Sequence, residues 1–173
     1  MATTTLTNTR TPTRSLTREA IAAVLGAVVV AVGALLGPRA AFGSLMLYLL
    51  AGFAGLPVFA NIPGLPMGAA RIIGPTGGYL LVFPIAAAVT GWLVQGREGR
   101  FLVTLGAAAV GMVIIHLGGV SMLLAQTGGT GKAFAFGVVP FLVNDVLKCL
   151  AIAGLGALTG RQALAWLMGG SPR

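Results

Sequence analysis

The chain has 173 residues, of which 57% are hydrophobic and only 8% are charged, and its formal net charge is +8. A soluble domain carries about 25% charged residues, so this composition excludes an ordinary soluble globular protein. It predicts a single membrane domain, with lipid as the solvent for much of the apolar surface.

The positive charge does not indicate nucleic acid as a partner. Lys and Arg residues stand one or two at a time between apolar runs, as they do beside membrane spans, and the sequence has no basic face with interleaved aromatic residues. The single cysteine, Cys149, excludes an internal disulfide and a metal cluster built from several cysteines. Membrane lipid is therefore the first expected partner, and no metal site is predicted.

Five strongly apolar segments follow a polar beginning. Residues 1–18 are rich in Thr and Arg, and we expect a solvated tail there, although this composition also resembles a transit peptide. The apolar segments lie at about 20–36, 40–56, 76–95, 101–125 and 134–158. They approach the roughly 17–25 residues of a transmembrane helix, and the alternation of a membrane β-strand is absent. The sequence predicts an all-α integral membrane protein, a bundle of five transmembrane helices within residues 19–160, with a C-terminal tail at 161–173.

The connection between the second and third segments differs from the others. Residues 55–75, GLPVFANIPGLPMGAARIIGP, contain four prolines and four glycines, so they cannot form an uninterrupted helix. Broken apolar backbone is tolerated at membrane depth where it is buried in protein or lines a cavity. We expect this Pro/Gly-rich loop to be a lid or re-entrant segment that shapes a pocket. Arg71 within it is either an ordinary loop charge or a contact for an anionic substrate, and the residues alone favour neither.

Asp145 and Lys148 give the sharpest signal for a binding site. They lie in the last apolar segment, where a charge near the bilayer centre costs about 2.5–3.5 kcal/mol. A spacing of three places them on one helical face, so they can form a pair, and Asn144 adds a third polar group. The functional interpretation is the polar end of a ligand pocket. The alternative is a structural ion pair near a helix end, with Lys148 reaching toward the interface.

No catalytic group of residues can be placed in this sequence. His116 has no second ligand at metal-binding spacing, so we interpret it as a packed or hydrogen-bonded residue. The three acidic residues suggest no pair of carboxylates for acid–base catalysis. The segment QTGGTGKAF resembles a phosphate-binding loop, but Gln126 and Ala133 stand where that pattern needs glycine and a hydroxyl residue. We therefore expect a protein that is not an enzyme and takes any energy from a partner or a gradient.

Three segments occur in order along the chain: LGPRAAFGSLMLYLLAGFAGLPVFA (36–60), GPTGGYLLVFPIAA (74–87) and PFLVNDVLKCLAIAG (140–154). Together they resemble the BioY family, the biotin-binding S components of energy-coupling-factor (ECF) transporters, over about 120 residues. The resemblance implies a small helical protein in a prokaryotic plasma membrane that captures biotin in a pocket open to the outside. It also implies partners, namely a transmembrane coupling subunit and two ATPase subunits. Biotin is then the transported ligand, and no cofactor is expected.

The resemblance also assigns site residues. Matched motif by motif, residues 74–79 form part of the biotin pocket beside the loop at 56–59, and two adjacent glycines let the backbone approach the ligand. Asp145 and Lys148 match the family's acidic and basic pair on the final helix. The biotin-binding residues expected on this basis are Phe59, Asn61, Arg71, Gly74, Thr76, Gly77, Gly78, Tyr79, Asn144, Asp145 and Lys148.

The sequence departs from the family pattern in two places. The family has six spans, whereas five are predicted here, and it has PFLPGD where this chain has PFLVND at 140–145. Two alternatives stay open: an S component for another small vitamin, and a shortened membrane protein that does not transport. The family orientation puts Arg97 and Arg100 in the cytoplasm and the 56–75 connection outside, which we expect for a multi-pass protein.

Overall fold

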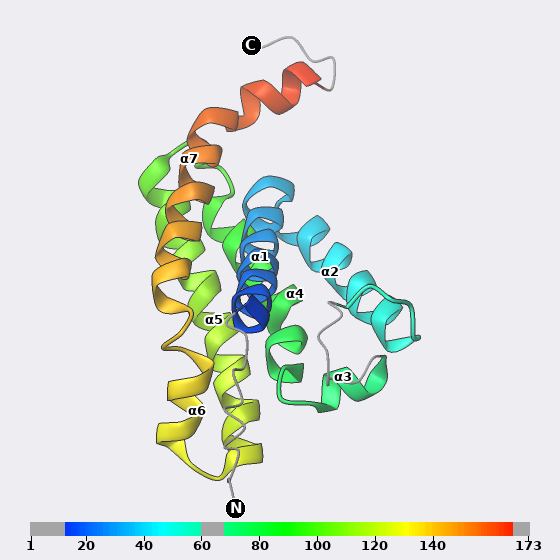
Figure 1. Ribbon diagram of the computed structural model, residues 1–173. Helices are drawn as coiled ribbons and strands as arrows, with labels where there is room; N and C mark the ends of the chain where they lie inside the picture. Colours follow the sequence, from blue (N-terminus) through cyan, green and yellow to red (C-terminus); the bar gives the residue numbers. More distant parts are fainter. Residues whose placement is uncertain (1–12, 60–67, 168–173) are drawn as a thin grey trace, which may run out of the picture.

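The structure, a computed structural model, describes residues 13–59 and 68–167 (Figure 1). These residues form helices and turns, without a strand between them, so the predicted all-α fold is confirmed. The helices are α1 (Thr13–Leu36), α2 (Pro38–Phe53), α3 (Ala69–Ile73), α4 (Gly77–Val94), α5 (Phe101–Thr127), α6 (Thr130–Gly137) and α7 (Leu142–Leu167). The first and last of these extend into the two predicted tails, because residues 13–18 and 161–167 are helical.

Glycine and proline determine where several helices begin and end. α2 begins at Pro38, where the missing N–H and the fixed φ of proline suit the first helical position. Gly37, which separates α1 from α2, has a φ of 78°, a conformation that glycine adopts without a steric penalty. After α5, Gly128 takes a left-handed conformation and its N–H donates to the carbonyl of Leu124, which closes the last turn of that helix.

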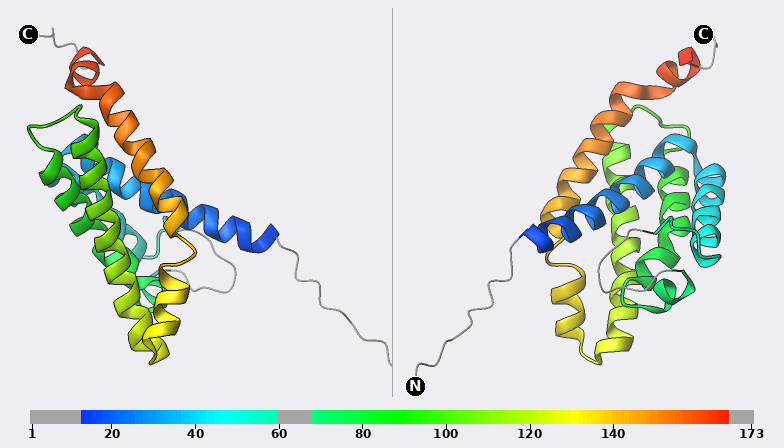
Figure 2. Two further views of the ribbon diagram at one scale, coloured as in Figure 1. Left: turned by 90° about the vertical axis from the view of Figure 1, so that its left-hand side faces the viewer. Right: turned by 45° about the vertical axis from the view of Figure 1, so that its right-hand side comes forward.

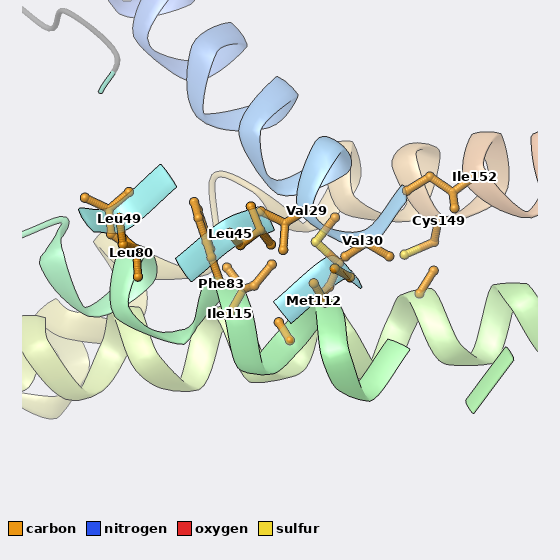
Figure 3. Close-up of a cluster of buried hydrophobic side chains, with 14 of the residues drawn as sticks. Val29, Val30, Leu45, Leu49, Leu80, Phe83, Met112, Ile115, Cys149 and Ile152 are labelled. Atoms are coloured by element: carbon orange, nitrogen blue, oxygen red, sulfur yellow. The ribbon is translucent and has the colours of Figure 1, made fainter. Parts of the chain in front are cut away.

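α4 lies at the centre of the bundle. It packs against α1, α2 and α5, and α7 lies against both α1 and α5 (Figures 1 and 2). Small residues let α1 and α4 approach closely, since a Cβ atom on Gly33 would meet the backbone of Ala87. Five helices contribute to the core shown in Figure 3, which includes Val29, Val30, Leu45, Leu49, Leu80, Phe83, Met112, Ile115, Cys149 and Ile152.

The surface and the helix lengths fit a membrane protein. Among the described helices, α4 and α5 are long and apolar enough to cross a membrane, with mean hydropathies of 1.7 and 2.1 over their most apolar windows. Large apolar side chains also point outward from other helices, including Leu47 on α2 and Leu158 on α7, which is 83% exposed. Lipid tails are the solvent for which such a surface is suited.

The last predicted span is not one helix. The sequence predicts one apolar segment at 134–158, but α6 ends at Gly137 and α7 begins at Leu142. Pro140 lies in the break, and in a continuous helix its ring would clash with the carbonyl four residues earlier. This apolar segment is therefore divided between two helices, α6 and α7, within the predicted all-α bundle. The Pro/Gly-rich connection also contains a short helix, α3, which the sequence did not predict.

Candidate ligand-binding cavity

A cavity with a volume of about 130 Å³ opens among α1, α2, α3, α4, α5 and α7. Its walls are mostly apolar, with side chains such as Leu25, Leu80, Phe83 and Met112. Phe59, which is 3% exposed, also lines it and packs edge-on against Tyr48, with the two ring centres 5.4 Å apart. The few polar side chains in the lining form two groups, one at α5 and α7 and the other at α2, α3 and the beginning of α4.

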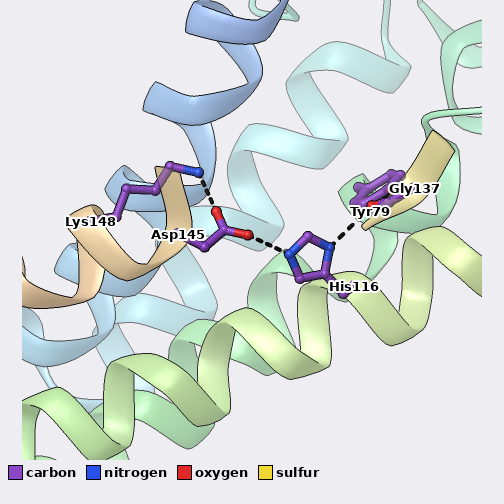
Figure 4. Close-up of polar contacts among 5 residues, drawn as sticks. All are labelled: Tyr79, His116, Gly137, Asp145 and Lys148. Atoms are coloured by element: carbon purple, nitrogen blue, oxygen red, sulfur yellow. Dashed lines mark hydrogen bonds and ion pairs between the residues drawn. The ribbon is translucent and has the colours of Figure 1, made fainter. Parts of the chain in front are cut away.

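The first polar group contains the charged pair that the sequence predicts. Lys148 Nζ lies 2.5 Å from Asp145 Oδ1, and the two residues are one turn apart on α7 (Figure 4). His116 on α5 completes the group, because its Nε2 lies 2.5 Å from Asp145 Oδ2. The three side chains are only 10–18% exposed. The predicted pairing is confirmed, and so is the interpretation of His116 as a hydrogen-bonded residue.

Two further contacts join this group to the end of α6. The hydroxyl of Tyr79 donates to the carbonyl oxygen of Gly137 over 2.8 Å, and His116 Nδ1 lies 3.2 Å from the same oxygen. A carbonyl oxygen has two lone pairs and can accept both hydrogen bonds. Tyr79 and His116 thus connect α4 and α5 to the last residue of α6, just before the break that precedes α7 (Figure 4).

The second polar group consists of Tyr48 on α2, Arg71 on α3 and Thr76 immediately before α4. Arg71 is 4% exposed, and burial lowers the pKa of its guanidinium from the ordinary value, although arginine remains protonated in proteins. The hydroxyls of Tyr48 and Thr76 are buried and have no hydrogen-bond partner among the described residues. Buried polar atoms without a partner cost free energy, so both hydroxyls can gain from a polar ligand atom or water.

The cavity contains some of the residues expected from the sequence and not others. Those that line it are Phe59, Arg71, Thr76, Tyr79, Asp145 and Lys148. Those that do not are Gly74, Gly77, Gly78 and Asn144, while Asn61 lies outside the described residues. A Cβ atom on Gly77 would meet the backbone of Ile72, and one on Gly78 would meet the backbone of Gly118, so both glycines permit close backbone packing. A role in ligand contact remains a prediction for these residues.

Among the polar residues of the lining, the sequence reasoning missed Tyr48 and His116. Each is a polar or amphipathic side chain within an otherwise apolar segment, and polar groups at membrane depth are often functional. That signal was present in the sequence for both positions. Neither had a neighbour along the chain with which to form a recognisable motif, because their partners come from other helices.

Comparison with known proteins agrees with this architecture. The family model of the BioY family matches residues 18–165. A probable biotin transporter BioY of Pyrococcus horikoshii is 44% identical over 116 residues, which cover 67% of this chain and 65% of that protein. The biotin transporter BioY of Thermotoga maritima is 40% identical over 124 residues, which cover 72% of this chain and 70% of that protein. The matched part therefore spans about two thirds of each relative's length.

A solved structure has the same fold. The crystal structure of the S-component for biotin from an ECF-type ABC transporter superposes with a TM-score of 0.63 at 19% sequence identity. The superposition covers 89% of this chain and 94% of that one. The fold, the family model over most of the chain and the identity to curated relatives agree. The chain therefore belongs to the BioY family.

Proposed function

We propose that this protein captures biotin in a membrane and presents it for uptake, as the S component of an ECF transporter. The names of its relatives and the fold it shares with a biotin S-component support this role. The observation that carries the proposal is the cavity itself, because two groups of polar side chains and a larger number of apolar ones line it together. Biotin combines the same kinds of chemistry, with a ureido group, a compact apolar bicycle and a valerate chain that ends in a carboxylate.

The two polar groups suit different ends of this ligand. Asp145 accepts hydrogen bonds from the ureido N–H groups, since an ionised carboxylate is an acceptor only. Arg71 binds the ligand carboxylate, for which its guanidinium has a matching fork of donors. The hydroxyls of Tyr48 and Thr76 also line the cavity and supply further donors. Lys148 contacts Asp145, so its proposed role is to orient the carboxylate that accepts from the ureido group.

The charge of the cavity favours an acid over a cationic vitamin. Arg71 and Lys148 each contribute a positive charge, and Asp145 is the single carboxylate among the described lining residues, so the cavity carries an excess of positive charge. A carboxylate ligand balances that charge, whereas a cation adds to it. This difference separates biotin from a positively charged vitamin such as thiamine as the ligand of the cavity.

The purified protein is expected to bind biotin with a Kd below about 1 μM in detergent. Biotin amide should bind more weakly because it cannot offer a carboxylate to Arg71, and thiamine should not compete. Isothermal titration calorimetry and displacement of labelled biotin measure the three affinities. Absence of both heat and displacement at micromolar biotin would contradict the proposed ligand.

The proposed partners and location follow from the same role. The chain lacks a phosphate-binding loop at 126–133, so the energy for transport comes from other subunits. We assign that function to a transmembrane coupling subunit and two ATPase subunits in the prokaryotic plasma membrane. In this arrangement α5 crosses the membrane from Arg100 in the cytoplasm to Gly128 outside, and Arg97 and Arg100 obey the positive-inside rule.

A thiol-labelling experiment tests this orientation. Cys149→Ala removes the only cysteine, and Glu98→Cys then introduces one in the turn between α4 and α5. An impermeant maleimide is expected to leave residue 98 unlabelled in intact cells and to label it after permeabilisation. Gly129→Cys is the matched variant at the other end of α5, where a side chain has open space, and it should react in intact cells. Labelling of residue 98 in intact cells would reverse the proposed topology.

A further inference from the structure

His116 has an acceptor at each of its two ring nitrogens. Nδ1 lies 3.2 Å from the carbonyl oxygen of Gly137, and Nε2 lies 2.5 Å from Asp145 Oδ2 (Figure 4). A carbonyl oxygen only accepts hydrogen bonds, and so does an ionised carboxylate. A neutral imidazole carries one N–H and can donate to only one of them, whereas the doubly protonated ring donates to both.

The surroundings favour the proton on His116 rather than on Asp145. Lys148 Nζ lies 2.5 Å from the other carboxylate oxygen, and its charge stabilises the ionised form of Asp145. An imidazole is intrinsically a stronger base than a carboxylate. A proton on Asp145 would leave the Lys148 ammonium beside a neutral acid. In the charged arrangement the carboxylate lies between two cations, so both short contacts are attractive.

The position of the Gly137 carbonyl adds to this preference. Gly137 is the last residue of α6, and the C-terminal end of a helix carries a partial negative charge that favours a cation. From α4, Tyr79 places its ring edge-on to that of His116, with the two ring centres 6.5 Å apart, and its hydroxyl donates to the same carbonyl. Both described hydrogen-bond partners of the His116 ring, the Gly137 carbonyl and the Asp145 carboxylate, are therefore acceptors.

We propose that His116 is a charged positioning residue, which ties the Asp145 carboxylate to the end of α6 through a doubly protonated imidazole. Asp145 lies in the first turn of α7, directly after the break at 138–141. Its own helix therefore extends mainly on the C-terminal side of this residue. α5 is continuous for 27 residues, and His116 on it supplies the second support. The carboxylate is thereby held in one orientation before ligand arrives. The effect on biotin rests on the proposed function, whereas the protonation state of His116 does not.

The protonation state can be read directly, because His116 is the single histidine of the chain. Protein labelled with [15N]histidine, purified through a tag without histidine, gives ring nitrogen signals from this residue alone. At neutral pH we expect both nitrogens to show the shifts of a doubly protonated ring. Asp145→Asn should convert the spectrum to that of a neutral tautomer, while Lys148→Met, the matched variant that keeps the carboxylate, should not. A neutral tautomer in the unaltered protein would overturn the proposal.

A double-mutant cycle tests the positioning effect. His116→Gln is expected to raise the Kd for biotin about tenfold in the otherwise unaltered protein and by less than twofold in the Asp145→Asn background, because the two residues act together. A loss of equal size in both backgrounds would show that His116 acts independently of Asp145 and would overturn the positioning role. If the unaltered protein binds no biotin, the proposed function fails, and the nitrogen spectrum still decides whether His116 holds the charge.

Discussion

Replacing Asp145 by asparagine is expected to weaken biotin binding about ten- to a hundred-fold. Asp145 is the single carboxylate among the described residues that line the cavity. Hydrogen bonds to a charged group contribute about 1.5–3 kcal/mol, which corresponds to that change in affinity. The amide keeps the size of the side chain but loses its charge and one acceptor oxygen. Calorimetry in the same detergent, on both proteins, measures the difference.

Lys148→Met separates two assignments for the ligand carboxylate. Because Lys148 contacts Asp145, its loss is expected to weaken biotin and biotin amide to a similar extent, through the orientation of the aspartate. Arg71→Gln, by contrast, should weaken biotin much more than the amide, because we propose that Arg71 binds the carboxylate. If Lys148→Met weakens the binding of free biotin but not of biotin amide, the ligand carboxylate contacts Lys148 and not Arg71.

The alternative of a purely structural ion pair makes a different prediction for Asp145→Asn. Removal of the carboxylate leaves the Lys148 ammonium, whose side chain is 11% exposed, without its counter-charge, so the melting temperature falls in either case. Affinity well below the melting transition distinguishes the two. A folded Asp145→Asn protein with full biotin affinity would show that the pair is structural and that the site assignment is wrong.

The charged pair was predictable from local sequence because the physical argument is local. Two opposite charges in an apolar segment are costly alone, and their spacing of three places them on one face of a helix. The contact between Lys148 and Asp145 confirms this reasoning. The Pro/Gly-rich connection was predictable in the same way, because its prolines exclude a continuous helix, and it supplies Phe59 and Arg71 to the cavity.

The rest of the site depends on which helices pack together, and this information is not local. His116 is 29 residues before Asp145, and nothing near it in the sequence indicates that α5 packs against α7. Tyr48 similarly lines one cavity with Arg71 and Thr76 only because α2, α3 and the beginning of α4 all border it. The break at Pro140 is difficult to predict for a different reason. The residues around this proline are apolar, so hydrophobic length alone indicates one continuous span, although the proline interrupts the helix.

The absence of a side chain at Gly78 can serve either ligand binding or helix packing. From the sequence, its missing side chain is expected to let the backbone approach a ligand. In the structure, a Cβ atom on Gly78 would meet the carbonyl of Gly118 and would lie 2.6 Å from Met122 Cβ on α5. Gly118 has the reciprocal relation, because its own Cβ atom would lie 2.6 Å from the Gly78 carbonyl oxygen. These two glycines therefore mark a point where the backbones of α4 and α5 come close together, which small residues permit in membrane bundles.

Gly78→Ala is accordingly expected to destabilise the bundle, with a melting temperature lower by about 5–10 °C. Overpacking costs about 1–3 kcal/mol of stability. The added methyl group would meet backbone atoms of Gly118, and backbone cannot change rotamer to make room. Gly106→Ala is the matched control on α5, because a Cβ atom there has open space, and the higher helix propensity of alanine should leave its melting temperature equal or slightly raised. Thermal unfolding of the three proteins in one detergent makes the comparison. Equal melting temperatures for the two variants would mean that α4 and α5 are not in close backbone contact at Gly78.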